Sequence, residues 1–211
     1  MEQYIVDNTE LDNTELDNTP TAVEIFIIDS SINGQVLKDF SIIYNKYLNG
    51  EISYIHIYLC SDGGTTCYTD ALLDMINQMG MDVCITAFGT IASSAFNLFY
   101  RATCPCRLLP LTVGMIHQSY VETYINELGQ VKDPSMNNSF FKSYRKDYLD
   151  ATIQLGEYLE FSKSETLLLR KGKDTWFSPN RMLELLNTKN NKIFVQNDYK
   201  PVYFNGEAGI A

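Results

Sequence analysis

The sequence predicts an α/β fold with a mostly parallel sheet, and two kinds of observation lead to it. Short apolar runs rich in β-branched and aromatic residues, typical of buried strands, alternate with longer segments whose apolar residues recur at helical spacing. The 211-residue chain is also 45% hydrophobic, which is enough to build one well-packed domain. Strands that alternate with helices form crossover units, and these units bury a parallel sheet on both sides.

The first half of the chain contains four predicted strands joined by three predicted helices. Turn-forming or helix-capping residues separate these elements, among them the Asn49-Gly50 pair that ends the first helix. The predicted strands cover residues 22–29, 54–60, 82–89 and 111–118, and the predicted helices cover residues 35–48, 69–80 and 93–102.

The second half is predicted to be mainly helical. A polar, tyrosine-rich segment at 120–134 is expected to form a hairpin or loop, because it contains Gly129 and Pro134. A long amphipathic helix at 138–159 follows, since its apolar residues form one stripe with charges between them. The remaining predicted elements are a short helix at 162–172, a strand-like segment at 174–178 and a helix at 179–187.

The two ends are predicted to lie outside the folded domain, which would span residues 22–188. Residues 7–19 read DNTELDNTELDNT, a five-residue repeat that fits neither helix nor strand. This acidic composition cannot offset the entropy cost of ordering the backbone, so residues 1–21 are expected to form a flexible arm. Such an arm is either a solvated tail without a role or an adaptor or gate. Residues 189–211 are expected to be an irregular tail.

Charge and hydropathy exclude several classes of partner. The formal net charge of −10 opposes binding to a nucleic-acid backbone or to an anionic membrane surface. No apolar run is long enough to cross a bilayer, and the N-terminus lacks the basic start and apolar core of a signal peptide. The expected location is therefore the cytoplasm.

The cysteines indicate free thiols, and neither a metal nor a cofactor is predicted. Five cysteines without a secretion signal do not suggest a disulfide framework. Two of them lie in a Cys-Pro-Cys sequence, but with only His56 and His117 available this does not make a zinc-ligand pattern. The five are Cys60, Cys67, Cys84, Cys104 and Cys106.

Two strand-to-helix junctions carry the candidate site, one at 60–66 (CSDGGTT) and one at 89–96 (GTIASSAF). In parallel α/β folds, binding sites form where strands end and helices begin, because free backbone N–H groups there attract negative charge. The second junction is rich in small residues, which allow close approach of a substrate. It offers Ser93 and Ser94 as candidate nucleophiles.

A nucleophilic serine needs a base, and histidine is the usual one because its pKa lies close to neutral pH. His117 ends the next predicted strand, which would bring it to the same edge of the sheet as the serines. His56 stands in the middle of a strand between two isoleucines and is interpreted as a structural residue.

Four motifs, IYLCSDGG, GTIASSA, GMIHQ and KDTWFSPNRM, resemble in order and spacing those of the Clp protease proteolytic subunit (ClpP) family and its phage-encoded relatives. The resemblance covers about residues 22–186. It implies the fold shared by ClpP and crotonase, built of repeated ββα and βαβ units, with residues 138–159 as a protruding handle helix. The family's SPGG motif resembles residues 61–64 here, with Asp62 in place of proline, and Lys173 stands where the family usually has arginine.

The resemblance also implies the roles of five residues. Ser93 would be the nucleophile, His117 the base, and Asp174 the carboxylate that orients the histidine. The backbone N–H groups of Gly64 and Ser94 would form the oxyanion hole.

The assembly implied by the resemblance is a pair of stacked rings around a chamber. The rings would contain copies of this chain or mix it with a paralogue, and an ATP-driven unfoldase of the AAA+ class would supply unfolded polypeptides. Three alternatives remain open: a catalytically silent ring subunit, a phage head-maturation protease, and a crotonase-type enzyme acting on acyl-coenzyme A.

Overall fold

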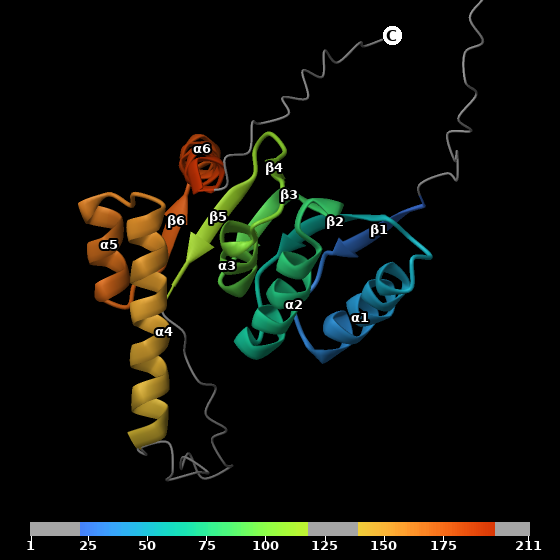
Figure 1. Cartoon of the computed structure of the whole chain (residues 1–211). Helices are drawn as coiled ribbons and strands as arrows, with labels where there is room; N and C mark the ends of the chain where they lie inside the picture. The colour runs from blue at the N-terminus through green and yellow to red at the C-terminus, as the bar shows by residue number, and fades with distance from the viewer. Residues whose placement is uncertain (1–21, 118–138, 197–211) are drawn as a thin grey trace, which may run out of the picture.

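A computed structural model describes residues 22–117 and 139–196, and a six-stranded sheet forms its centre (Figure 1). The strands lie in the order β1-β2-β3-β5-β6, and β4 pairs with β3 beside β5. All neighbouring strands are parallel except β5 and β6, which run antiparallel. The predicted α/β fold with a mostly parallel sheet is confirmed. The bounds are β1 Val23–Ile28, β2 Tyr54–Ser61, β3 Val83–Ala92, β4 Cys106–Leu108, β5 Val113–Ile116 and β6 Thr175–Phe177.

Three helices lie side by side against one face of the sheet: α1 (Gly34–Leu48), α2 (Thr66–Met79) and α3 (Ser94–Arg101) (Figure 1). The Asn33 side chain caps α1 by accepting hydrogen bonds from the Gln35 and Val36 N–H groups. Each helix connects two parallel strands, which is the crossover arrangement that the alternating pattern predicted.

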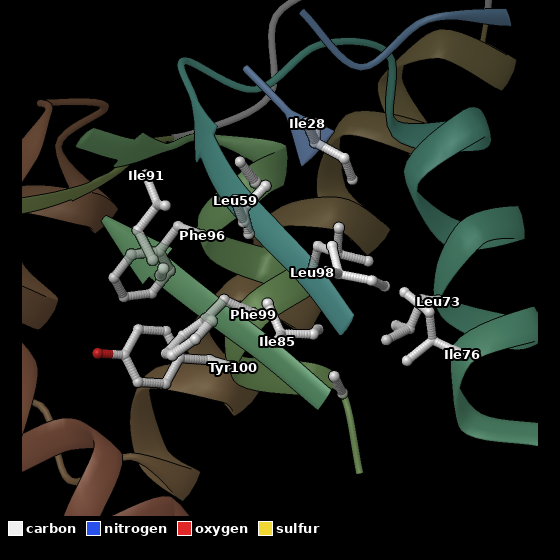
Figure 2. Packing of buried hydrophobic residues seen from close by; sticks show 14 of the residues in the cluster. Ile28, Leu59, Leu73, Ile76, Ile85, Ile91, Phe96, Leu98, Phe99 and Tyr100 are labelled. Atoms are coloured by element: carbon white, nitrogen blue, oxygen red, sulfur yellow. The ribbon is translucent and has the colours of Figure 1, made fainter. Parts of the chain in front are cut away.

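Much of the hydrophobic core lies between the sheet and these helices (Figure 2), and the same cluster continues into α4, α5 and α6. Buried side chains of β2 and β3, such as Leu59 and Ile85, lie near those of α2 and α3. The helix α3 is buried from Ser94 to Tyr100, so no face of it is left for solvent. Its burial fixes the first turn of α3 firmly against the ends of the central strands.

The second half of the chain packs at the β5 and β6 end of the sheet. It contains α4 (Ser139–Tyr158), α5 (Lys163–Arg170) and α6 (Pro179–Gln196), with β6 between the last two. In Figure 1, α4 projects well beyond the sheet. A long helix at the predicted position is confirmed, and Pro179 occupies the first helical position, where its missing N–H has no cost.

The structure corrects the prediction in four places. The strand β4 was not predicted, because three residues carry no periodic signal. The helix α2 begins at Thr66 rather than at 69, and β3 continues to Ala92 rather than ending at 89. The prediction of an irregular tail from residue 189 is wrong for residues 189–196, since α6 runs to Gln196. Tertiary contacts of the buried Lys189 stabilise a segment rich in asparagine, whose own helix propensity is weak.

Three predictions lie outside the described residues: the arm at 1–21, the hairpin or loop at 120–134, and the tail at 197–211. No described helix has an apolar stretch long enough to span a membrane.

Candidate active site

Ser93 lies in a sharp turn between the end of β3 and the start of α3. Its backbone has φ 54° and ψ −121°, a positive φ that is unusual for a residue other than glycine. The Ser93 N–H donates to the Met115 carbonyl of β5 at 2.8 Å, which holds the turn in place. Strained conformations of this kind persist where the surrounding structure enforces them, and they cluster at functional sites.

The strand that leads to Ser93 is bent just before the turn. Opposite β2, the register of β3 shifts between Leu59 and Ser61, which pair with Ala87 and Ile91. Gly89 lies inside this bulge with φ 60°, and a Cβ there would come within 2.9 Å of the Cys60 sulfur. The bulge redirects the end of β3, and a bulge beside an active site commonly has this effect.

His117 lies directly against Ser93. It follows the last residue of β5, and its Nε2 is 2.7 Å from the Ser93 Oγ. Because β3 and β5 are parallel neighbours, with Ala92 opposite Met115, the two side chains leave the sheet at the same edge. The predicted pairing of Ser93 with His117 therefore occurs in the structure.

Asp174 reaches the histidine through the antiparallel pairing of β5 with β6. Ile116 pairs with Thr175, so the next residue along β5 and the preceding residue of β6, His117 and Asp174, stand opposite each other. The His117 Nδ1 lies 3.8 Å from the Asp174 Oδ1, slightly beyond hydrogen-bond distance. The Asp174 side chain is 59% exposed, whereas that of His117 is 16% exposed.

The position of Asp174 depends on how α5 ends. Gly172, with φ 67°, donates its N–H to the Leu169 carbonyl, and the Lys173 N–H donates to the Leu168 carbonyl. This pattern is a Schellman motif, in which a glycine in the left-handed region closes the helix. The chain then enters β6 directly, with Asp174 at its start.

Ser94 has a different environment from that of its neighbour. It is 1% exposed, and its Oγ has no hydrogen-bond partner among the described residues. Its backbone N–H is the first of α3, and the first N–H groups of a helix have no acceptor within that helix. Of the two candidate nucleophiles, only Ser93 is in contact with a base.

Two glycines of the first junction line the same turn. A Cβ on Gly63 would lie 2.8 Å from the Ser93 Cβ and 2.9 Å from the Ser94 nitrogen, so only glycine fits this close contact. Gly64 pairs with Ile32: the Ile32 N–H donates to the Gly63 carbonyl, and the Thr65 N–H donates to the Ile32 carbonyl. The N–H of Gly64 takes no part in this pairing. The adjoining Asp62 side chain is exposed.

His56 has the partners of a structural residue. Its Nε2 lies 2.8 Å from the Thr86 hydroxyl, and its ring stacks on Tyr58 with centroids 4.4 Å apart. Burial, and then the charge of Arg107, lower the pKa of His56 below its ordinary value.

The five cysteines are free thiols. Across residues 22–117 and 139–196, no three side chains of His, Cys, Asp or Glu are grouped closely enough to bind a metal ion.

A family model for Clp proteases matches residues 24–146, which is more than half of the chain. The chain belongs to the Clp protease family. The match includes Ser93 and His117 but ends before Asp174, so the assignment of Asp174 rests on motif resemblance and on the geometry described above. A comparison with curated proteins found no match. Family membership makes a peptidase of the Clp type the general function class of this chain.

Sequence reasoning did not anticipate two features of this Clp protease family site. Gly63 was noted only as part of the junction at 60–66, and the lack of room for a Cβ there, beside the turn at Ser93, gave no signal in the sequence. The Met115 carbonyl that holds Ser93 is a backbone group, so no residue type could reveal it. The predicted parallel pairing of the strands before Ser93 and His117 could have located the Met115 contact, but it carries no information about Gly63.

Proposed function

We propose that this chain is a serine endopeptidase subunit that hydrolyses peptide bonds with Ser93, His117 and Asp174. The observation that carries the proposal is the 2.7 Å contact between the Ser93 Oγ and the His117 Nε2, made by a serine whose backbone is held at positive φ. A nucleophile on a sharp strand-to-helix turn, with a base in hydrogen-bond contact, is the arrangement that acyl transfer requires.

In the proposed mechanism, the Ser93 Oγ attacks the peptide carbonyl while the His117 Nε2 accepts its proton. The same nitrogen then gives the proton to the leaving amine, and a water molecule activated by His117 releases the acyl group. Asp174 faces the other ring nitrogen, Nδ1, so it would stabilise the tautomer that leaves Nε2 free to accept a proton.

The developing oxyanion would be stabilised by the N–H groups of Gly64 and Ser94. Both belong to the junctions that meet at Ser93, and neither is used in the pairing of Gly64 with Ile32. Loss of one such donor typically costs about 2.7–4 kcal/mol of transition-state stabilisation. The exposed side chain of Asp62 supports the expectation that its charge faces solvent rather than the oxyanion.

A catalytically silent ring subunit is the second candidate, and the state of Asp174 favours it. At 3.8 Å, with its side chain 59% exposed, this carboxylate makes a long contact with His117 that solvent screens. In the active enzyme, the carboxylate would close to hydrogen-bond distance on assembly or on substrate binding, as catalytic contacts commonly do.

We further propose that copies of the chain, alone or with a paralogue, form stacked rings around a chamber that an ATP-driven unfoldase supplies with unfolded polypeptide. Two features support assembly. The helix α4 projects from the domain, and alternate side chains of β1 (Val23, Ile25 and Ile27) are more than half exposed. Exposed apolar surface of this kind is typical of protein interfaces.

The test is cleavage of an unfolded, fluorescently labelled casein by the full chain and two variants. We expect hydrolysis by the wild type, none by Ser93→Ala, and a rate reduced by up to about ten-thousandfold in Asp174→Asn, which would hold His117 in the wrong tautomer. Equal, background-level release by all three proteins would support the silent subunit instead.

A further inference from the structure

Lys189 of α6 is fully buried, which is costly for a charged side chain unless it is well partnered. Its Nζ donates to the Phe99 carbonyl at 2.8 Å and lies 2.8 Å from the Cys106 sulfur. The ammonium group also lies 5.4 Å from the centre of the Phe99 ring. In the part of the chain that the structure describes, no carboxylate pairs with Lys189, so the counter-charge must come from elsewhere.

Cys106 is the group that can supply this charge. It begins β4 and is half-buried, and its Sγ lies 3.4 Å from the carbonyl oxygen of Cys104 and 3.6 Å from that of Phe99. Burial works to raise the pKa of the Cys106 thiol, but the hydrogen bond from Cys104 and the nearby ammonium of Lys189 outweigh burial and lower it. The hydrogen bond with Cys106, followed by burial, raises the pKa of Cys104, which therefore stays protonated.

Nucleophilicity towards peroxides belongs to the thiolate, and redox-active cysteines commonly combine a stabilised thiolate with a second, resolving thiol. Cys106 is the more exposed of the pair, while Cys104 is only 3% exposed. An oxidant would therefore meet Cys106 first, and a second thiol stands two residues away in the chain, at Cys104.

We propose that Cys106 is a peroxide-reactive thiolate paired with Lys189, and that Cys104 resolves its oxidised form to a Cys104–Cys106 disulfide. In the first step, the Cys106 sulfur attacks hydrogen peroxide: an S–O bond forms, the O–O bond breaks, and hydroxide leaves and is protonated to water. In the second step, the Cys104 sulfur attacks the Cys106 sulfur, the S–S bond forms, the S–O bond breaks, and the proton of Cys104 leaves with hydroxide as water. In total, two thiols and one hydrogen peroxide give one disulfide and two waters.

The chain is well suited to a direct test, because trypsin releases Cys104 and Cys106 together in the short peptide 102–107. The other three cysteines remain in the peptide 47–101, which serves as an internal control and contains the exposed Cys67. The full chain is treated with hydrogen peroxide for increasing times, alkylated, digested and measured by mass spectrometry.

We expect peptide 102–107 to become lighter by two hydrogen atoms and to lose its ability to be alkylated. This loss should be several times faster than the loss of alkylatable thiols in peptide 47–101. In Cys104→Ser, the same peptide should instead carry a sulfenic acid that dimedone traps at Cys106. Oxidation of 102–107 no faster than the control peptide would overturn the proposal. A cross-link of Cys106 to Lys189 through one added oxygen atom would overturn the role of Cys104.

The role of Lys189 is tested by Lys189→Met, which retains the length of the side chain without its charge and should slow oxidation of 102–107 several-fold. If this variant does not fold, the pH dependence of Cys106 alkylation in the wild type tests whether Lys189 stabilises the thiolate. The titratable groups that face Cys106 are Lys189 of α6, Cys84 of β3, Tyr100 of α3 and Cys104. An alkylation midpoint well below the ordinary thiol value of about 8.5 supports the proposal, and a midpoint at or above it contradicts the proposal.

Discussion

Ser93 and Ser94 are adjacent in the chain, yet the fold gives them opposite environments. The turn at Ser93 directs its hydroxyl to His117, while the first turn of α3 buries the hydroxyl of Ser94. Gly63 makes this arrangement possible, because any side chain at that position would collide with the backbone of the turn. The geometry of this candidate site therefore depends on a residue that contributes no functional group.

Gly63→Ala is expected to reduce the proposed peptidase activity strongly without unfolding the domain. The new Cβ would meet the Ala92 carbonyl oxygen at 2.7 Å, so the turn must shift and carry Ser93 away from His117. A displacement of about 1 Å at a reacting group can reduce the rate by about a hundredfold, which casein hydrolysis would reveal.

Gly50→Ala is the matched control for this variant. Gly63 has a φ of 101° and Gly50 a φ of 74°, both positive, but nothing lies within 4 Å of a Cβ on Gly50. It should lose about 1–2 kcal/mol of folding stability while hydrolysis remains close to that of the wild type. Full activity in Gly63→Ala would show that the contact with Ser93 is unimportant.

At the level of elements, the site is assembled by strand register. Parallel pairing of β3 with β5 brings Ser93 to His117, and antiparallel pairing of β5 with β6 brings Asp174 to the same histidine. A shift of one residue in either pairing would move a side chain to the opposite face of the sheet. The contacts that hold α5, β6 and α6 together are therefore part of the support for the site.

The pair of Glu165 with Arg181 is one of these contacts. Glu165 completes the capping box of α5 with Ser162, and both of its carboxylate oxygens accept hydrogen bonds from Arg181 of α6 at 2.9 Å. Burial works to raise the pKa of Glu165, but the hydrogen bonds from Arg181 and Ser162 outweigh it and lower the pKa. The carboxylate form therefore stabilises the folded state.

Glu165→Gln is expected to lower the free energy of unfolding by about 1.5–3 kcal/mol at pH 7, because hydrogen bonds to a charged group are lost. Because the folded-state pKa is depressed, this stabilisation is complete above the unfolded value of about 4.3 and disappears as the pH falls through the folded value. Urea unfolding of both proteins at pH 7 and at progressively lower pH measures the difference. A stability difference that stays constant into the acid range would contradict this assignment.

Most of these elements could be predicted from periodicity and capping, because a long, regular apolar pattern is a stronger signal than the propensities of single residues. The three-residue β4 and the last two turns of α6 could not, because contacts distant in sequence stabilise them. At the site, chain order and parallel pairing predicted that His117 would lie at the same edge of the sheet as Ser93 and Ser94. The choice of Ser93 over Ser94, and the use of Asp174, came only from the family resemblance. The geometry separates the two serines, because only the Ser93 Oγ contacts the His117 Nε2, and it leaves Asp174 3.8 Å from the Nδ1 of that histidine.

At the scale of the whole molecule, two features at opposite ends of the domain bear on assembly. The outer face of β1 is exposed at one end, and α4 projects at the other (Figure 1). A single domain leaves the apolar side chains of β1 exposed at a cost unless another chain covers them. Stacked rings remain a proposal, and the native mass is the quantity that tests it.

The purified protein is expected to have a native mass many times that of its 24.1 kDa chain. Phe141→Glu, on the apolar stripe that the sequence predicts for α4, should shift the mass to smaller species. Lys146→Glu places the same charge at an exposed position of the same helix and should leave the assembly intact. Native mass spectrometry would contradict the ring proposal by finding only monomer in the wild type.

The central claim is that Ser93 is a nucleophile activated by His117, and labelling with a fluorophosphonate tests it most directly. Mass spectrometry of the intact chain should show one added phosphonyl group in the wild type and in Ser94→Ala, because alanine retains the backbone N–H that Ser94 is proposed to contribute. Ser93→Ala should show none, although it replaces one small residue by another, and His117→Ala should label far more slowly because the base is lost. Label retained in Ser93→Ala and lost in Ser94→Ala would contradict the account.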